Sequence, residues 1–173
     1  MTPVTAVMPT SQIVLRALVL LGPVVALLAT GPAGHWPPWW IVLGVVAMSA
    51  GFAARPDSPL GAAVSLAVLV WWTISLSDTV QPEVMLAAAG LVVAHLAALV
   101  ASYGPNALPV TAATLRRWAL RGVLVLATVP ATWGAAVLLS GEPEQPGIWI
   151  VGVIATLAVT VAATVALGDR REA

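Results

Sequence analysis

Six apolar runs separated by short polar segments dominate the hydropathy pattern of the chain. Each run approaches or reaches the roughly 17 to 25 residues that a helix needs to cross a bilayer. The runs occupy residues 13–30, 39–54, 60–76, 83–102, 115–139 and 148–167. We therefore expect an all-α fold, a bundle of six transmembrane helices that forms one integral membrane domain over residues 1–173.

Proline and glycine separate the runs. The turn at 31–38 and the turn at 55–59 each contain two or more prolines, and residues 1–12 form a polar lead-in. A cleaved signal peptide is the alternative for the first run, because Arg16 precedes an apolar core. We favour an uncleaved helix, since a second run follows at once. A five-helix model, with the second and third runs as a re-entrant hairpin, would split the arginines between two faces.

Charge and indole rings orient this arrangement. With six spans, all seven arginines fall on one side of the membrane, and basic residues in short loops mark the cytoplasmic face. The N and C termini are then both cytoplasmic. The residues that set this topology are Arg55, Arg116, Arg117, Arg121, Arg170 and Arg171. Seven of the eight tryptophans map to the opposite half, where aromatic rings settle at headgroup level.

Composition narrows the class further. Hydrophobic residues make up 60% of the chain and charged residues 8%, against about 25% charged residues in soluble domains. The mean hydropathy is +1.00. The net charge is zero and no long basic run exists, which argues against nucleic-acid binding. Without cysteine the chain has no disulfide, thiolate nucleophile or Cys-based metal site.

His95 is the ionisable residue that lies deepest within a predicted span, and such a group is a functional candidate by default. The plainer interpretation, which we favour, is a neutral imidazole hydrogen-bonded to a neighbouring helix. His35 lies in a turn among tryptophans, on a different face, so the two histidines do not form one zinc site.

Two further features belong to the fifth and sixth runs. Thr156, Thr160 and Thr164 recur every four residues, and Gly90, Ala94 and Ala98 repeat the spacing on the fourth run. Such stripes indicate either a close helix–helix seam, which we favour, or a hydrophilic path. Pro130 frees a carbonyl in the fifth run and predicts a kink, with a hinge or binding notch as the alternative.

Short stretches of the chain resemble a family of small multipass actinobacterial membrane proteins. They are Arg55-Pro56-Asp57-Ser58-Pro59, His95 in its alanine-rich helix, Tyr103-Gly104-Pro105 and Leu115-Arg116-Arg117-Trp118. Members of that family have no assigned activity and are often encoded beside MoxR-type ATPases. The resemblance implies a plasma-membrane protein and is compatible with a role as the membrane element of a chaperone-like assembly. It supplies no catalytic residues.

These observations favour a non-enzymatic membrane protein that assembles with itself or with other membrane proteins in the lipid bilayer. The sequence lacks a zinc-protease helix, a phosphate-binding loop and a serine nucleophile elbow, and we expect no cofactor and no metal. The rival hypothesis is a small transporter or channel subunit that uses His95, the threonine stripe and Pro130 as a translocation path.

Overall fold

The structure is a computed structural model that describes residues 9–76, 81–102 and 112–140, together with residues 150, 154, 157 and 158. The described part is all-α and contains no strand. Its helices are α1 (Thr10–Leu28), α2 (Trp39–Ala54), α3 (Leu60–Ser75), α4 (Glu83–Ser102) and α5 (Ala112–Leu139). The all-α expectation is confirmed for these residues, and each of the first five apolar runs forms a helix.

The chain divides into two compact units, Met1–Ser140 and Gly141–Ala173, and all five helices belong to the first. The sixth run, 148–167, lies outside the described residues except for four positions, which are helical. The helices α1, α4 and α5 are long and apolar enough to cross a membrane. The helices α2 and α3 are apolar but have 16 residues each, about 24 Å at 1.5 Å per residue. The six-span count therefore stays a prediction.

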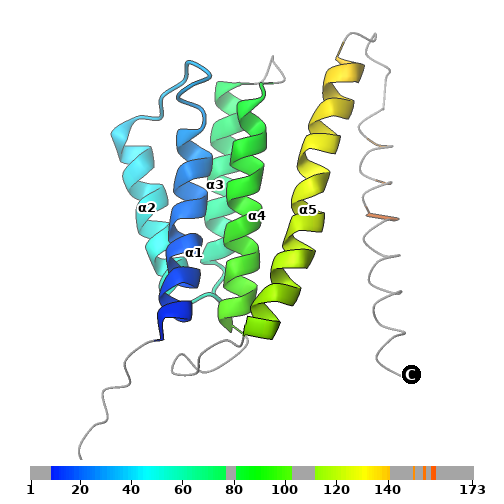
Figure 1. Cartoon of the computed structure of the whole chain (residues 1–173). Coiled ribbons are helices and arrows are strands. Elements are labelled where there is room, and N and C mark those ends of the chain that lie inside the picture. The colour runs from blue at the N-terminus through cyan, green and yellow to red at the C-terminus, as the bar shows by residue number, and fades with distance from the viewer. Residues whose placement is uncertain are drawn as a thin grey trace, which may run out of the picture. The chain divides into compact units, whose positions relative to one another are not determined.

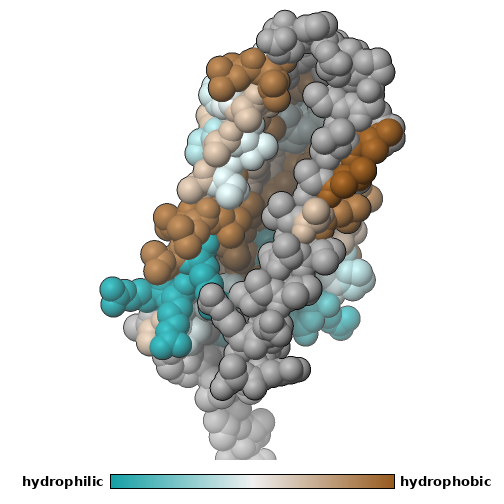
Figure 2. All heavy atoms as spheres, turned by 90° about the vertical axis from the view of Figure 1, so that its right-hand side faces the viewer, coloured by the Kyte–Doolittle hydropathy of each residue, from teal (hydrophilic) through white to brown (hydrophobic). Residues whose placement is uncertain are grey.

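Successive helices run in opposite directions, so the first unit has two distinct ends (Figure 1). At one end α1, α3 and α5 begin and α2 and α4 finish. We call it the arginine end, because the five described arginines lie there: Arg16, Arg55, Arg116, Arg117 and Arg121. The opposite end, the tryptophan end, has indole rings from α2, α3, α5 and the α1–α2 turn. Figure 2 shows hydrophilic surface gathered toward one end and apolar surface beyond it.

Helix α1 lies at the centre of the packing and contacts α2, α3 and α4. One face of it is buried, with side chains at the three- and four-residue spacing of a helix stripe. That face consists of Gln12, Leu15, Val19, Gly22, Pro23, Ala26 and Leu27. Helices α2 and α3 add Val45, Phe52, Ala53, Val64 and Val68 to the core, and α4 adds Ala87, Ala97, Ala98, Val100 and Ala101.

Helices α1 and α4 cross at a pair of glycines. A Cβ atom added to Gly90 would lie 2.7 Å from the carbonyl oxygen of Gly22, and one added to Gly22 would meet the carbonyl oxygen of Gly90. Around this point α4 buries Ala94 and Ala98. Small residues at this spacing let two backbones approach closely. The stripe predicted on the fourth run is thus a packing seam, and its partner among the described residues is α1.

Helices α1 and α5 each begin three residues before the predicted run, and the other helix boundaries lie within two residues of the prediction. The expected lead-in of residues 1–12 is wrong for its last part, because Thr10 to Gln12 form the first turn of α1 and Gln12 is buried. Pro9 occupies the position just before the helix, with φ −66° and ψ 147°. A hydropathy pattern does not detect this first turn because its residues are polar. Only the packing against other helices shows that it belongs to α1.

Candidate functional site

His95 lies on α4 seven residues before that helix finishes, and its side chain is exposed. It lines a hollow of about 210 Å³ beside Asp57 and Ser58 of the α2–α3 turn. Among the described residues no group forms a hydrogen bond with the imidazole, so the bond that we expected to a neighbouring helix is not found there. The threonine stripe that would test a translocation path lies outside the described residues.

Arg16 links α1 to α2 at the arginine end. Its Nη1 donates to the carbonyl oxygen of Ala53 at 2.6 Å and to that of Ala54 at 3.0 Å. These carbonyls belong to the last turn of α2, where a helix lacks internal donors and carries partial negative charge. The structure thus identifies the acceptors of this charged side chain as backbone oxygens of a neighbouring helix.

The topology-determining arginines of the described part are all exposed: Arg55, Arg116, Arg117 and Arg121. Arg121 lies over the ring of Trp118, with its guanidinium carbon 5.6 Å from the ring centre. This contact is a cation–π pair on one helix face. It gives Trp118, the one tryptophan at the arginine end among the described residues, a local partner. Arg170 and Arg171 lie outside the described residues, together with Thr156, Thr160 and Thr164.

Two tryptophans of α3 bind α1 near the tryptophan end. The indole N–H of Trp72 donates to the carbonyl oxygen of Ala26 at 2.9 Å. The indole N–H of Trp71 donates to the hydroxyl of Thr30 at 3.2 Å, and that hydroxyl donates to the carbonyl oxygen of Leu27 at 2.9 Å. The sequence places both rings at an interface, whereas the structure also gives them a structural role.

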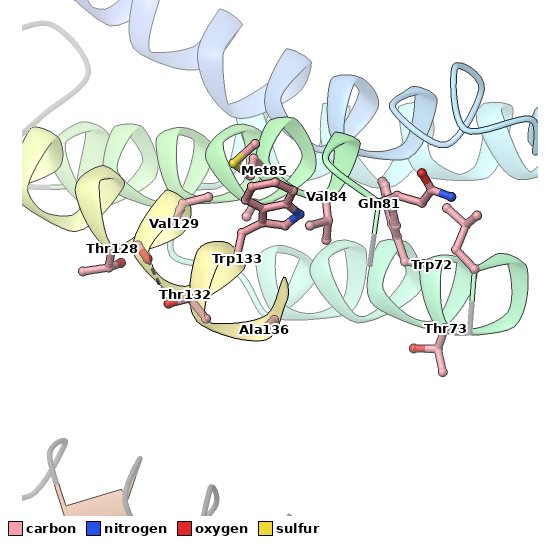
Figure 3. Close-up of a pocket in the computed structure, with 12 residues that line it drawn as sticks. Trp72, Thr73, Gln81, Val84, Met85, Thr128, Val129, Thr132, Trp133 and Ala136 are labelled. Carbon is pink, nitrogen blue, oxygen red and sulfur yellow. Dashed lines mark hydrogen bonds between the residues drawn. The ribbon is translucent and has the colours of Figure 1, made fainter. Parts of the chain in front are cut away.

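A cleft of about 600 Å³ opens between α3, α4 and α5. Figure 3 shows the ring of Trp133, from α5, pointing toward Val84 and Met85 of α4. The indole nitrogen of Trp133 is buried and has no hydrogen-bond partner among the described residues. The remaining wall is mostly apolar and includes Trp72, Val129 and Ala136.

The threonine hydroxyls of this cleft are already hydrogen-bonded within their own helices. Thr73 donates to Leu69, and Thr128 donates to Val125. Thr132 donates to the carbonyl oxygen of Thr128 at 2.8 Å, across the turn that contains Pro130. Threonine in a helix commonly satisfies itself in this way. The cleft therefore suits an apolar chain better than a polar solute, and Pro130 itself is exposed rather than directed into a binding notch.

Sequence reasoning missed one surface. Ala127, Ala131 and Ala135 follow the four-residue spacing on α5, and all three are exposed. Leu124 and Leu138 extend the same face and are 66% and 83% exposed. The spacing is visible in the sequence, but only the structure separates this stripe from the one that α4 buries.

Comparisons with protein-family models, curated proteins and solved structures found no match.

Proposed function

We propose that the protein is a plasma-membrane protein with six transmembrane helices and both termini in the cytoplasm. It acts without catalysis, by assembling with itself or with another membrane protein. Three long apolar helices support the membrane location. The confinement of the described arginines to one end supports the orientation, because loop arginine is enriched on the cytoplasmic side.

The observation that carries the assembly proposal is the exposed alanine stripe of α5. On α4 the same spacing of small residues packs against α1, with Gly90 touching Gly22. On α5 the stripe of Ala127, Ala131 and Ala135 has no described helix on it. In lipid, helices associate through close packing of small residues rather than through hydrophobicity, so a surface of this kind favours a partner helix.

Photocrosslinking tests this proposal. Because the chain has no cysteine, a maleimide probe labels only the cysteine that is introduced. A benzophenone maleimide is attached to Ala131→Cys in the full chain, in native membranes. The matched control is Leu66→Cys on α3, which is 62% exposed and continues at four-residue spacing into the bulky side chains of Val70 and Ile74. We expect Ala131→Cys to give a crosslinked dimer or an adduct with a second membrane protein, and Leu66→Cys to give neither.

Equal crosslinking at both positions would indicate random collision and contradict the proposal. A crosslink from Ala131→Cys to the protein's own carboxyl-terminal segment would also overturn it, because this face would then be filled within one chain. The orientation has a separate test. A phosphatase fused to the carboxyl terminus should be inactive if that terminus is cytoplasmic, and activity would reverse the assignment.

The transporter hypothesis retains one observation in its favour, the exposure of His95 beside Asp57. A proton or cation path needs these groups to control transport. His95→Gln should then abolish a solute or proton flux measured in proteoliposomes. Absence of any such flux in the unmodified protein would remove this hypothesis and leave the assembly proposal untouched.

A further inference from the structure

Two adjoining hollows form a polar depression at the arginine end. The larger, of about 410 Å³, lies between α1, the α2–α3 turn and the end of α4. The smaller, of about 210 Å³, contains His95 and continues along α4. Both are lined by Pro56, Asp57, Ser58 and Ser102. The depression is thus centred on the turn that joins α2 and α3.

The charge of the larger hollow is dominated by two guanidinium groups. Arg16 lines it with its position fixed by the two carbonyl oxygens at the end of α2. Arg55 lines it from the turn, is exposed, and has no acceptor among the described residues. Asp57 contributes one carboxylate. With two arginines and one aspartate, the hollow carries net positive charge and favours an anion.

The buried hydroxyl of Ser58 points to the same conclusion. Its oxygen is inaccessible to solvent and has no hydrogen-bond partner among the described residues, although it lines both hollows. A buried polar group without a partner costs free energy, and a ligand that supplies an acceptor would recover it. A phosphate oxygen placed here would give Arg55 and Ser58 an acceptor, close to the guanidinium of Arg16, which the two carbonyl oxygens hold in place.

The depression lies where lipid headgroups would meet the protein. It is formed at the ends of α2 and α4, and α1 continues from Arg16 to Thr10, about 9 Å further at 1.5 Å per residue. Polar groups at helix ends stand at headgroup level when the helices cross a bilayer. Basic pockets between transmembrane helices at this level recognise anionic headgroups.

We propose that this depression binds the phosphate of an anionic phospholipid whose headgroup carries hydroxyl groups. Arg16 and Arg55 hold the phosphodiester, and Ser58 donates its hydroxyl proton to a phosphate oxygen. Asp57 accepts a hydrogen bond from a headgroup hydroxyl, and its charge disfavours a bare phosphate ion. The site goes beyond the assembly proposal and requires only that the helices cross a bilayer, whichever leaflet the arginine end faces.

The test is native mass spectrometry of the full chain, purified from vesicles that contain phosphatidylglycerol, phosphatidylethanolamine and phosphatidylcholine in equal amounts. We expect phosphatidylglycerol to be retained preferentially. Arg55→Gln should reduce this preference about fivefold, because one basic side chain near an anionic headgroup contributes about 1 kcal/mol. Ser58→Ala should reduce it further. Arg16 is left intact because it supports α2.

Arg117→Gln is the matched control, since Arg117 is exposed at the same end but does not line the depression. It should leave the preference unchanged. An equal loss in Arg117→Gln would show that surface charge alone selects the lipid and would overturn the site. Equal retention of the three lipids would do the same. Displacement of the lipid by soluble glycerol phosphate would overturn the lipid as the source of the phosphate.

Discussion

The contact between α1 and α4 and the surface of α5 use similar residues in opposite ways. On α4 the small residues Ala94 and Ala98 are buried, and Gly90 touches Gly22 of α1. On α5 the stripe that includes Ala131 is exposed, and this helix packs chiefly against α4. Small residues alone therefore do not determine burial. The difference comes from whether a second helix presents a matching flat face, which α1 provides through Gly22.

The largest expected effect concerns two leucines. Leu27 is fully buried in α1, whereas Leu138 of α5 is 83% exposed. Leu27→Ala should lower the free energy of unfolding by about 2–5 kcal/mol, because the cavity left in a packed core is not refilled. Leu138→Ala should change it by less than about 0.5 kcal/mol. Reversible unfolding in mixed micelles gives both values, and similar losses would mean that α5 is packed as tightly as α1.

Two arginines at the arginine end allow a second comparison between a side chain that contacts another helix and one that is exposed. Arg16→Met removes two hydrogen bonds from the last turn of α2 and should destabilise the protein by about 1.5–3 kcal/mol, the contribution of a charged hydrogen bond. Arg117→Met should have almost no effect on stability, since Arg117 is exposed. The midpoint of thermal unfolding in detergent measures the difference. An unchanged midpoint for Arg16→Met would rule out the carbonyl contact as a stabilising one.

A smaller effect is expected from two glycines. In Gly22→Ala the added methyl group would lie 2.7 Å from the Cβ of Ala94 and would also meet the backbone of Gly90. Such overpacking costs about 1–3 kcal/mol. In Gly134→Ala the methyl group meets nothing within 4 Å, and alanine is the better helix former by about 1 kcal/mol. Temperature-dependent size-exclusion chromatography measures the thermal stability of both variants. Gly22→Ala should be less stable than the unmodified protein, and Gly134→Ala should not.

The smallest difference is expected from two tryptophans. Trp72→Phe loses a hydrogen bond to the carbonyl oxygen of Ala26 and should cost about 0.5–1.5 kcal/mol. Trp133→Phe removes a buried N–H that has no described partner, so it should be neutral or slightly stabilising. Denaturant titration followed by circular dichroism measures the free energy of unfolding of both variants. Destabilisation by Trp133→Phe would point to an acceptor for its N–H beyond the described residues.

Much of the helix layout was predictable from the sequence because hydropathy and proline act locally. The bounds of α2 and α4 agree with the predicted 39–54 and 83–102. The start of α1 was not predictable, since Gln12 is polar and becomes buried only through contacts with other helices. Side-chain geometry was harder still. Nothing in the sequence links Arg16 to Ala53 or Trp72 to Ala26, because these contacts depend on how the helices pack.

The candidate site was predictable only in part. His95 was identified from its position in an apolar run, but its neighbours Asp57 and Ser58 come from a turn about forty residues earlier, and the sequence alone gave no reason to pair them. The α5 stripe has the same spacing as the α4 stripe, so the sequence could not separate a buried seam from a free one. That distinction requires the relative placement of helices.

The hydrogen bonds from Arg16 to α2 also have a consequence for biosynthesis. The carbonyl oxygen that it binds lies 37 residues later in the chain. While a ribosome is still making the first helix, that acceptor does not yet exist, and the guanidinium needs water as its partner. Helix α1 can therefore complete this contact only after the last turn of α2 has been synthesised.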